Sequence, residues 1–374
     1  MLPGSIFIMK NTMKKYKRIL SLGLCLIMML VFSGCKKNNT GNDDKALDKE
    51  GGYSQDEASN TKVMKVGEYD ITLDEAMIYT LQYVYMQGMT ADAMTDEKVT
   101  ELKNSILDNI RQVKMIYDVA CHNDYSLSEA DMTTVTQAVA NCKNMFTQEL
   151  MDKYGISDEA LERVFTEQYT VEQFTAYIKN DMKSRILEDL EKAYEDYQFI
   201  SLTFIRFPTV EIEDEMPKKD EDGNYIYLSE EEKLKMQEKA QSALKDLQSG
   251  MEYNQVMENY GVKAYSYDNT GYIGGYSDEL NARLENMQVG DFTDIMDDDL
   301  GYCIVVMTAM DDGTTKATYV NMQAEEVLKD EFDTLQGKWL STISIDTEND
   351  LYDTVWIDFD IKLLTKDMEQ VTSK

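Results

Sequence analysis

The sequence predicts an α+β protein with a mostly helical segment, then a mixed helix-and-strand segment, then a final helix and strand. Three observations predict this order. Residues 63–196 open on a short alternating stretch and continue in long stretches of helical periodicity. Residues 197–311 begin and end in continuous β-prone runs, with helical stripes and glycine turns between them. Residues 312–365 carry one more helical stripe and an alternating segment, so the 374 residues divide into two or three domains.

Helix signals divide the first of these segments into a short strand and several helices. Thr72 and Glu75 have the spacing of a capping box, which predicts that a helix begins directly after Thr72. Three further helices are predicted at about 96–123, 128–154 and 157–198. Many of the 25 methionines of the chain lie here. At helical spacing they indicate core positions, and the alternative is an adaptable apolar surface that binds varied ligands.

The mixed segment begins with a β-prone run at 199–207, followed by an acidic insertion. In this insertion Asp222-Gly223-Asn224 predicts a hairpin turn. The alternative, a calcium loop with glycine at its sixth position, would place Lys218 where a carboxylate is needed. A helix is predicted next from one apolar stripe: Met236, Ala240, Ala243, Leu244 and Leu247. A second short helix and an apolar strand at 304–307 complete the segment.

The last segment contains a helix and a strand. Its helical stripe consists of Val327, Phe332, Leu335, Trp339 and Ile343. Strict alternation over 355–361 predicts a final strand. Residues 366–374 are then a tail.

The acidic composition limits the choice of partners. The formal net charge is −33, with 70 acidic against 37 basic side chains. Such a surface repels phosphate backbones and anionic headgroups, so we expect no nucleic-acid partner and disfavour direct binding to anionic lipid. The alternative interpretation is that the acidity only keeps an exported protein soluble.

The first 35 residues have the pattern of a secretory signal. A basic start is followed by an apolar run over 19–32, which is short for a membrane-spanning helix. The run ends in Phe32-Ser33-Gly34-Cys35, which resembles a bacterial lipobox. That resemblance implies cleavage before Cys35 and lipidation of its thiol, with the protein held on the extracytoplasmic face of the cell membrane. An uncleaved N-terminal anchor is the alternative, and Met9 and Met13 are alternative start sites.

Residues 36–62 are polar and contain almost no apolar side chains. Such a segment cannot offset the entropy lost on ordering, so we expect a disordered tether between the anchor and the folded body.

Three cysteines remain after the signal: Cys121, Cys142 and Cys303. An odd number excludes a complete disulfide framework. Cys121 and Cys142 fall on successive predicted helices, on the order of 15 Å apart along an antiparallel pair. That separation is too large for a disulfide, so we predict three buried free thiols.

Three motifs in the mixed segment resemble the second half of a parvulin domain, a small prolyl-isomerase fold. The glycine turn is Gly271, Gly274 and Tyr276. A helix end follows at Met287, Gly290 and Asp291, and the start of the last strand is 300–304. The resemblance implies a parvulin-like α/β domain over 197–311.

The order of a short strand and several helices over 63–196 resembles the N-terminal chaperone domain of PrsA- and SurA-like foldases. In that group the C-terminal segment packs back on the N-terminal domain, and the parvulin domain is inserted between them. The resemblance therefore implies a SurA-like helical domain completed by the helix and strand of 312–365.

The residues expected at the parvulin catalytic positions are not those of the family, which uses two histidines and a Cys or Asp. Aligned without gaps, these positions fall on Phe204, near Gly261 and on Cys303, with Thr203 and Val262 as the alternatives to the first two. The single histidine of the chain, His122, lies in the helical segment, and we expect it to be exposed or to cap a helix end. A histidine-based hydrolase and a histidine metal site are thereby disfavoured, and no metal or other cofactor is expected.

An apolar proline or peptide pocket remains a hypothesis for the same domain. Its candidate lining residues are Tyr272, Tyr276, Leu280, Met287, Phe292 and Tyr302. Ordinary core positions are the alternative for all six.

These observations favour a membrane-anchored extracytoplasmic chaperone or foldase that binds unfolded or nascent exported polypeptides. Its peptidyl-prolyl cis-trans isomerase activity is expected to be weak or absent. An active isomerase and a non-catalytic adaptor lipoprotein with one specific partner are the alternatives, and a homodimer is an open question.

Overall fold

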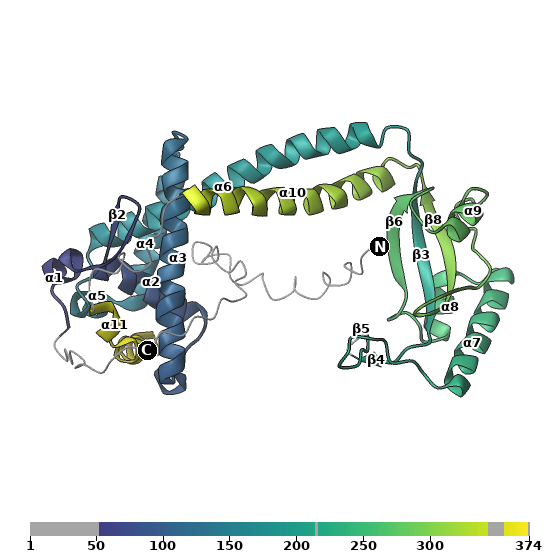
Figure 1. Ribbon diagram of the computed structural model, residues 1–374, viewed down its shortest axis with the longest axis horizontal. Coiled ribbons are helices and arrows are strands. Elements are labelled where there is room, and N and C mark those ends of the chain that lie inside the picture. The colour runs from purple at the N-terminus through teal and green to yellow at the C-terminus, as the bar shows by residue number, and fades with distance from the viewer. Residues whose placement is uncertain (1–51, 214–215, 343–354, 373–374) are drawn as a thin grey trace. The chain divides into compact units, whose positions relative to one another are not determined.

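The computed structural model describes residues 52–213, 216–342 and 355–372. The signal, Cys35 and most of the predicted tether lie outside these residues. The chain divides into two compact units (Figure 1). We call them the helical unit, which ends at Asn180 and resumes at Glu331, and the mixed unit, Asp181–Asp330. The predicted fold class is confirmed, since a mostly helical unit is interrupted by a unit that contains a β-sheet.

The helical unit contains one small two-stranded sheet and a set of helices. Its elements are α1 (Gln55–Asn60), β1 (Lys62–Val66), β2 (Tyr69–Thr72), α2 (Leu73–Met86), η3 (Ala91–Ala93), α3 (Asp96–His122), α4 (Glu129–Phe146), α5 (Gln148–Lys153), α11 (Val355–Asp358) and α12 (Ile361–Thr372). Two longer helices, α6 (Asp158–Ala193) and α10 (Thr314–Thr342), continue from this unit into the mixed unit.

Capping side chains and backbone angles explain where the helices begin and end. Ser128 and Asp131 form a reciprocal capping box at the start of α4. That helix ends at Phe146 because Thr147 has a φ of 59°, so the single helix predicted for 128–154 is two helices. The capping box predicted at the start of α2 is wrong. The Thr72 hydroxyl bonds to the Asp74 carboxylate instead, and Glu75 turns into the core.

Contacts with the helical unit begin about ten residues before the predicted end of the tether. The Tyr53 amide donates to the Lys153 carbonyl at 2.8 Å, and Ala58 of α1 is fully buried. The chain passes so close to Gly155 that a Cβ there would stand 2.5 Å from the Ser54 carbonyl oxygen. One buried alanine and a close backbone contact thus order a segment whose composition predicts disorder.

Four methionines of the helical unit for which we predicted a core role are buried, and four others are half-buried. Met77, Met94, Met115 and Met151 are each at most 5 % exposed and belong to one apolar core. This supports the core interpretation over the adaptable-surface alternative at these positions.

The C-terminal strand predicted for 355–361 is wrong. This stretch contains the short helix α11 and the start of α12. The buried residues from α11 to α12, Trp356, Phe359, Ile361, Leu364 and Met368, follow a spacing of mostly three and four. Ile357, a core position under the strand prediction, is 61 % exposed. The predicted tail is also largely helical, because α12 extends to Thr372 and packs on the helical unit.

A cluster of ionisable side chains lies inside the helical unit. Lys114 of α3 is 2 % exposed and contacts two carboxylates. Its Nζ lies 3.0 Å from Glu75 of α2 and hydrogen-bonds to Glu167 of α6. The half-exposed Arg163 approaches Glu75 to 3.5 Å. Burial raises the pKa of Glu75, and Lys114 opposes that shift. Each side chain of this cluster forms its ion pairs with a side chain from another helix.

The mixed unit is built around one antiparallel sheet with the strand order β6-β3-β8-β7. Its elements are β3 (Phe199–Pro208), β4 (Ile212–Glu213), β5 (Met216–Pro217), α7 (Glu230–Gln248), α8 (Tyr253–Asn259), β6 (Tyr267–Tyr272), α9 (Asp278–Leu284), β7 (Met296–Asp298) and β8 (Gly301–Met310). The strand predicted at 199–207 and the apolar strand at 304–307 are confirmed as parts of β3 and β8.

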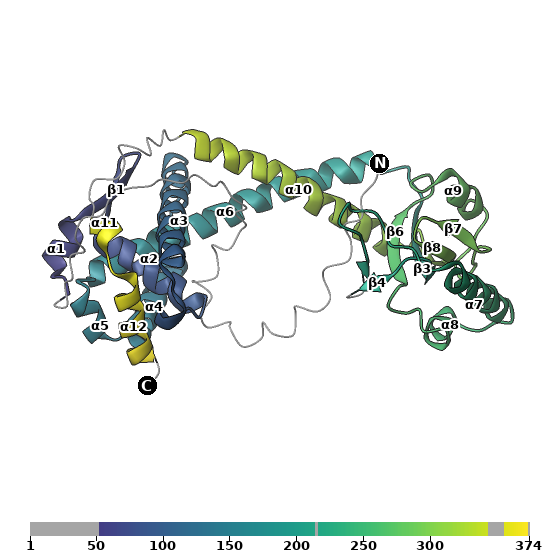
Figure 2. The same ribbon diagram turned by 60° about the horizontal axis from the view of Figure 1, so that its bottom comes forward.

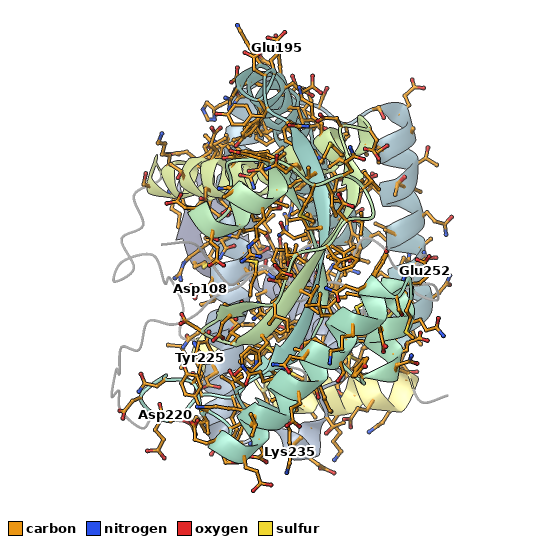
Figure 3. The ribbon with its side chains drawn as sticks, turned by 90° about the vertical axis from the view of Figure 1, so that its right-hand side faces the viewer. Asp108, Glu195, Asp220, Tyr225, Lys235 and Glu252 are labelled. Atoms are coloured by element: carbon orange, nitrogen blue, oxygen red, sulfur yellow. The ribbon has the colours of Figure 1, made fainter. Side chains whose placement is uncertain are left out.

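The acidic insertion forms the hairpin that its turn sequence predicts. The Asp220 amide donates to the Asn224 carbonyl at 2.9 Å, and Lys219 pairs with Tyr225. The Asp220 carboxylate accepts from the amides of Asp222 and Asn224 and closes the turn. Asp220 and Tyr225 are labelled on this hairpin in Figure 3.

The two faces of the sheet carry separate apolar cores. Ile205, Phe207 and Ile304 pack against α7 and α8. Leu202, Cys303 and other residues of the opposite face pack against α9. Figure 2 shows α9 apart from α7 and α8. We call the second face the α9 face.

Candidate functional site

The candidate site lies on the α9 face, where alternate residues of four strands come together. Phe204 of β3 stands opposite Tyr267 of β6 and Val305 of β8. Arg206 stands opposite Cys303, and Cys303 opposite Met296 of β7. Residues paired in an antiparallel sheet point to the same face. The register therefore brings two of the three predicted catalytic positions, Phe204 and Cys303, onto one face.

An aromatic layer covers one side of this site. The rings of Phe204 and Tyr267 are parallel, with centroids 4.8 Å apart and an interplanar angle of 4°. Tyr276 lies 6.5 Å from Phe204, and its hydroxyl donates to Asn269 Oδ1 at 2.7 Å. The three rings are half-buried. They therefore present apolar surface to solvent in a fixed arrangement.

An ion pair borders the aromatic layer. Arg206 Nη2 donates to Asp298 Oδ2 at 2.6 Å, and the guanidinium lies 5.4 Å from the Tyr267 ring centre. The Arg206 side chain is 11 % exposed. Its Nε is buried, with no hydrogen-bond partner among the described residues. The guanidinium is thus held in place by Asp298 and Tyr267.

The Cys303 thiol is not suited to nucleophilic or proton-transfer chemistry. Its side chain is 3 % exposed, and burial raises the pKa of the Cys303 thiol to about 12. Nearby Arg206 favours the thiolate, but by less than burial disfavours it. At neutral pH the thiol therefore stays protonated, and the thiolate is the reactive form.

The third predicted catalytic position does not join the other two. Gly261 lies in the exposed turn after α8, with a φ of 67°, beside Val262 of the core on the opposite face. The residue that β6 places beside Phe204 is Tyr267.

Sequence reasoning missed Tyr267, Arg206 and Asp298 as members of the site. Strand β6 was not predicted because its sequence is mostly polar and contains Gly271, and both features are unusual in strands. Its alternation of Tyr267, Asn269 and Gly271 on one face was the signal that could have found it.

The structure does not bring the six candidate pocket residues together. Tyr276, Leu280 and Met287 pack on the α9 face with Cys303. Phe292 and Tyr302 pack on the opposite face. Tyr272 lies in an aromatic cluster with Tyr194, Tyr197 and Tyr319, at centroid distances of 5.9, 4.8 and 5.6 Å. Only three of the six can contribute to one surface with Phe204 and Cys303.

Other candidate residues take ordinary positions. His122 is the last residue of α3 and is exposed, as predicted, with Nδ1 3.2 Å from the Asp118 carboxylate. The three cysteines are free, but Cys121 is exposed, so the prediction of three buried thiols is wrong for this residue. Within the described ranges, no cluster of three or more His, Cys, Asp or Glu residues is arranged to hold a metal ion. None of the helices in those ranges has the length and apolar character of a membrane span.

No family model and no curated protein matches the sequence. Solved structures that are similar include the foldase PrsA from Lactococcus lactis, with 13% identity and a TM-score of 0.33 over 77% of this chain and 96% of that one. PrsA from Bacillus subtilis has 16% identity and a TM-score of 0.27, over 81% and 98%. A structure from work on two SurA-like chaperones of Campylobacter jejuni, PEB4 and Cj1289, has 15% identity and a TM-score of 0.22, over 76% and 98%. These structures belong to the group that the sequence resembles.

Proposed function

We propose that this protein is a lipid-anchored extracytoplasmic chaperone that binds unfolded or nascent exported polypeptides. Its mixed unit is a parvulin-like domain with weak or absent prolyl-isomerase activity. The observation that carries the proposal is the composition of the α9 face. It presents half-buried aromatic rings at Phe204, Tyr267 and Tyr276, but no histidine, and its thiol is buried and protonated. Such a face suits the binding of apolar side chains better than catalysis.

The barrier to prolyl isomerisation explains why little activity is expected. Rotation about the peptide bond requires about 20 kcal/mol, and a catalyst must bind the twisted amide more tightly than the planar one. That requires hydrogen-bond donors which are free to engage the amide. On the α9 face the strongest donor is Arg206, whose Nη2 is bonded to Asp298 and whose Nε is buried. The remaining contribution is desolvation of the amide by the aromatic rings, and this contribution alone would give weak activity.

The N-terminal sequence supports the location. A basic start, an apolar run and a terminal Ser33-Gly34-Cys35 would export the chain and attach it to the membrane by lipid. The acidic body then disfavours close contact with anionic headgroups.

The proposal is tested with the chain from residue 36 onward, in two assays. We expect no acceleration of cis-trans exchange in Xaa-Pro peptides, which takes about 10–100 s without a catalyst. We expect saturable suppression of the aggregation of a chemically unfolded client. Replacing Phe204 and Tyr267 together with alanine should weaken client affinity roughly tenfold, the equivalent of about 1.4 kcal/mol.

A matched control is Tyr227→Ala, which removes an exposed ring far from this face in the sheet register and should leave client affinity unchanged. Acceleration that the double variant abolishes would instead establish an active isomerase. Failure to suppress aggregation at any ratio, with one stoichiometric and salt-sensitive partner recovered, would favour an adaptor.

A further inference from the structure

Strand β6 lies at an edge of the main sheet. Among the described strands, the order β6-β3-β8-β7 leaves β6 paired with β3 alone (Figure 1). The opposite edge is different, because β7 has three residues and the chain at 291–293 also bonds to β8. Strand β6 has six residues and contains neither proline nor lysine, which proteins commonly use to block such an edge.

The hydrogen-bond phase of β6 shows which backbone groups face outward. The Ile273 amide donates to the Gln198 carbonyl at 3.0 Å, so residue 273 faces β3. Antiparallel pairs alternate with a period of two, and Tyr267, Asn269 and Gly271 therefore also direct their amides and carbonyls toward β3. Asp268 and Thr270 direct theirs away from the sheet. No described backbone group bonds to these outward amides and carbonyls.

Side chains beside this edge differ between the two faces of the sheet. Tyr267 and Asn269 belong to the α9 face, next to the Phe204 and Tyr276 rings. Asp268 is exposed on the other face, where it accepts the Thr203 hydroxyl at 2.7 Å. No ion pair to Asp268 occurs among the described residues. An added strand would therefore meet aromatic surface on one face and an unneutralised carboxylate on the other.

We propose that the β6 edge binds an extended client segment as an additional antiparallel strand. This rests on the proposed chaperone function and specifies the segment. Residues that lie opposite Asp268 and Thr270 would be basic or polar, and the alternate residues beside Tyr267 would be apolar. Backbone hydrogen bonds do not depend on sequence, so such an edge can bind many client sequences. The side chains of alternate residues then determine which client sequences bind more tightly.

The charge of the protein favours a basic client segment over a second copy of this chain. Pairing two β6 edges antiparallel about Asn269 would bring the two Asp268 carboxylates close together, in chains that each carry a formal charge of −33. A client segment that alternates lysine and valine would instead place a positive charge near Asp268, so the repulsion becomes an attraction.

The test uses a fluorescent nine-residue peptide that alternates lysine and valine, and the chain from residue 36 onward. In an antiparallel addition the lysines opposite Asp268 and Thr270 turn their amides toward β6. N-methylation of the lysine amides should therefore weaken binding at least tenfold, whereas N-methylation of the valine amides should not. Both modified peptides keep their charge, so equal affinities would overturn the proposal.

Protein variants provide a second measurement. Thr270→Pro removes one outward amide at a position where an edge strand tolerates proline, and it should weaken peptide binding about tenfold. Thr270→Val keeps the amide and should bind within about twofold of the original chain. Asp268→Asn, which can still accept the Thr203 hydroxyl, should weaken the lysine peptide more than a serine-valine peptide.

The outcomes separate the two proposals. Unchanged peptide affinity in Thr270→Pro, with aggregation suppression intact, overturns the edge site and leaves the chaperone function standing. Absence of both peptide binding and aggregation suppression in the original chain overturns the chaperone function itself. A concentration-dependent dimer that Thr270→Pro converts to monomer would assign the edge to a second copy and overturn the client proposal. The N-methyl peptides decide the matter if Thr270→Pro fails to fold.

Discussion

Replacing Lys114 with methionine is expected to lower the free energy of unfolding of the helical unit by about 3–5 kcal/mol. Lys114 lies between Glu75 and Glu167, and all three side chains are at most 6 % exposed. Removing the ammonium leaves two carboxylates in the core without a compensating charge, apart from the half-exposed Arg163. Urea unfolding followed by circular dichroism measures the loss.

The same variant should show a characteristic pH dependence. The folded-state pKa of Glu75 is already raised above its ordinary value of 4.5. A carboxyl with a raised pKa binds its proton more tightly in the folded state, so it favours folding at low pH and this contribution is lost as pH rises through the folded pKa. Without Lys114, the destabilisation should therefore be largest at pH 7 and smaller at pH 5.

Two controls separate the buried charge from the loss of a lysine. Lys98→Met, at an exposed position on the same helix, should change stability by no more than about 0.5 kcal/mol. Adding Glu75→Gln and Glu167→Gln to Lys114→Met should recover much of the loss. A penalty that is equal at both pH values would contradict the assignment.

Replacing Trp356 with alanine should destabilise the helical unit by a similar amount, about 3–5 kcal/mol. Trp356 is 2 % exposed, and its ring stacks on Phe359 with centroids 5.7 Å apart. Phe359 in turn contacts Tyr53 and Tyr154 at 6.1 and 6.3 Å. Truncation would open a cavity where the C-terminal segment meets both the end of α5 and the residues just before α1.

Ile357 is the control for this prediction because it is adjacent and 61 % exposed. Ile357→Ala should shift the thermal midpoint by no more than about one or two degrees. If the structure were the strand that the alternating sequence predicts, Ile357 would share the core face with Phe359 and its truncation would cost several times more. Equal losses in the two variants would contradict the helical arrangement.

Local signals predict much of the fold. The helix expected at 96–123 is α3, which ends one residue earlier, because its cap and apolar periodicity agree. The run at 199–207 becomes β3 since it is buried on both faces of the sheet. The alternation at 355–361 predicted a strand wrongly, because a seven-residue pattern can fit either a strand or the start of a helix. The burial of Trp356 in α11 favours the helix.

The candidate site is harder to predict because its members meet only through the sheet register. Phe204 and Cys303 can be aligned from sequence, but Tyr267 comes beside Phe204 only once β6 is known to be a strand. Glu75 shows the same limit. Its spacing from Thr72 fits a local cap, whereas its partner Lys114 lies in another helix. A contact between residues that are distant in sequence produces no local periodicity, so it cannot be predicted from a sequence pattern.

The path of the chain through α6 and α10 determines the order in which the two units can be completed. The mixed unit uses one continuous stretch, Asp181–Asp330. The core of the helical unit takes residues from both ends, from Ala58 to Met368. A chain that emerges amino end first can thus finish its later unit before its earlier one. The core of the helical unit stays incomplete until its C-terminal residues, from Trp356 to Met368, have joined it.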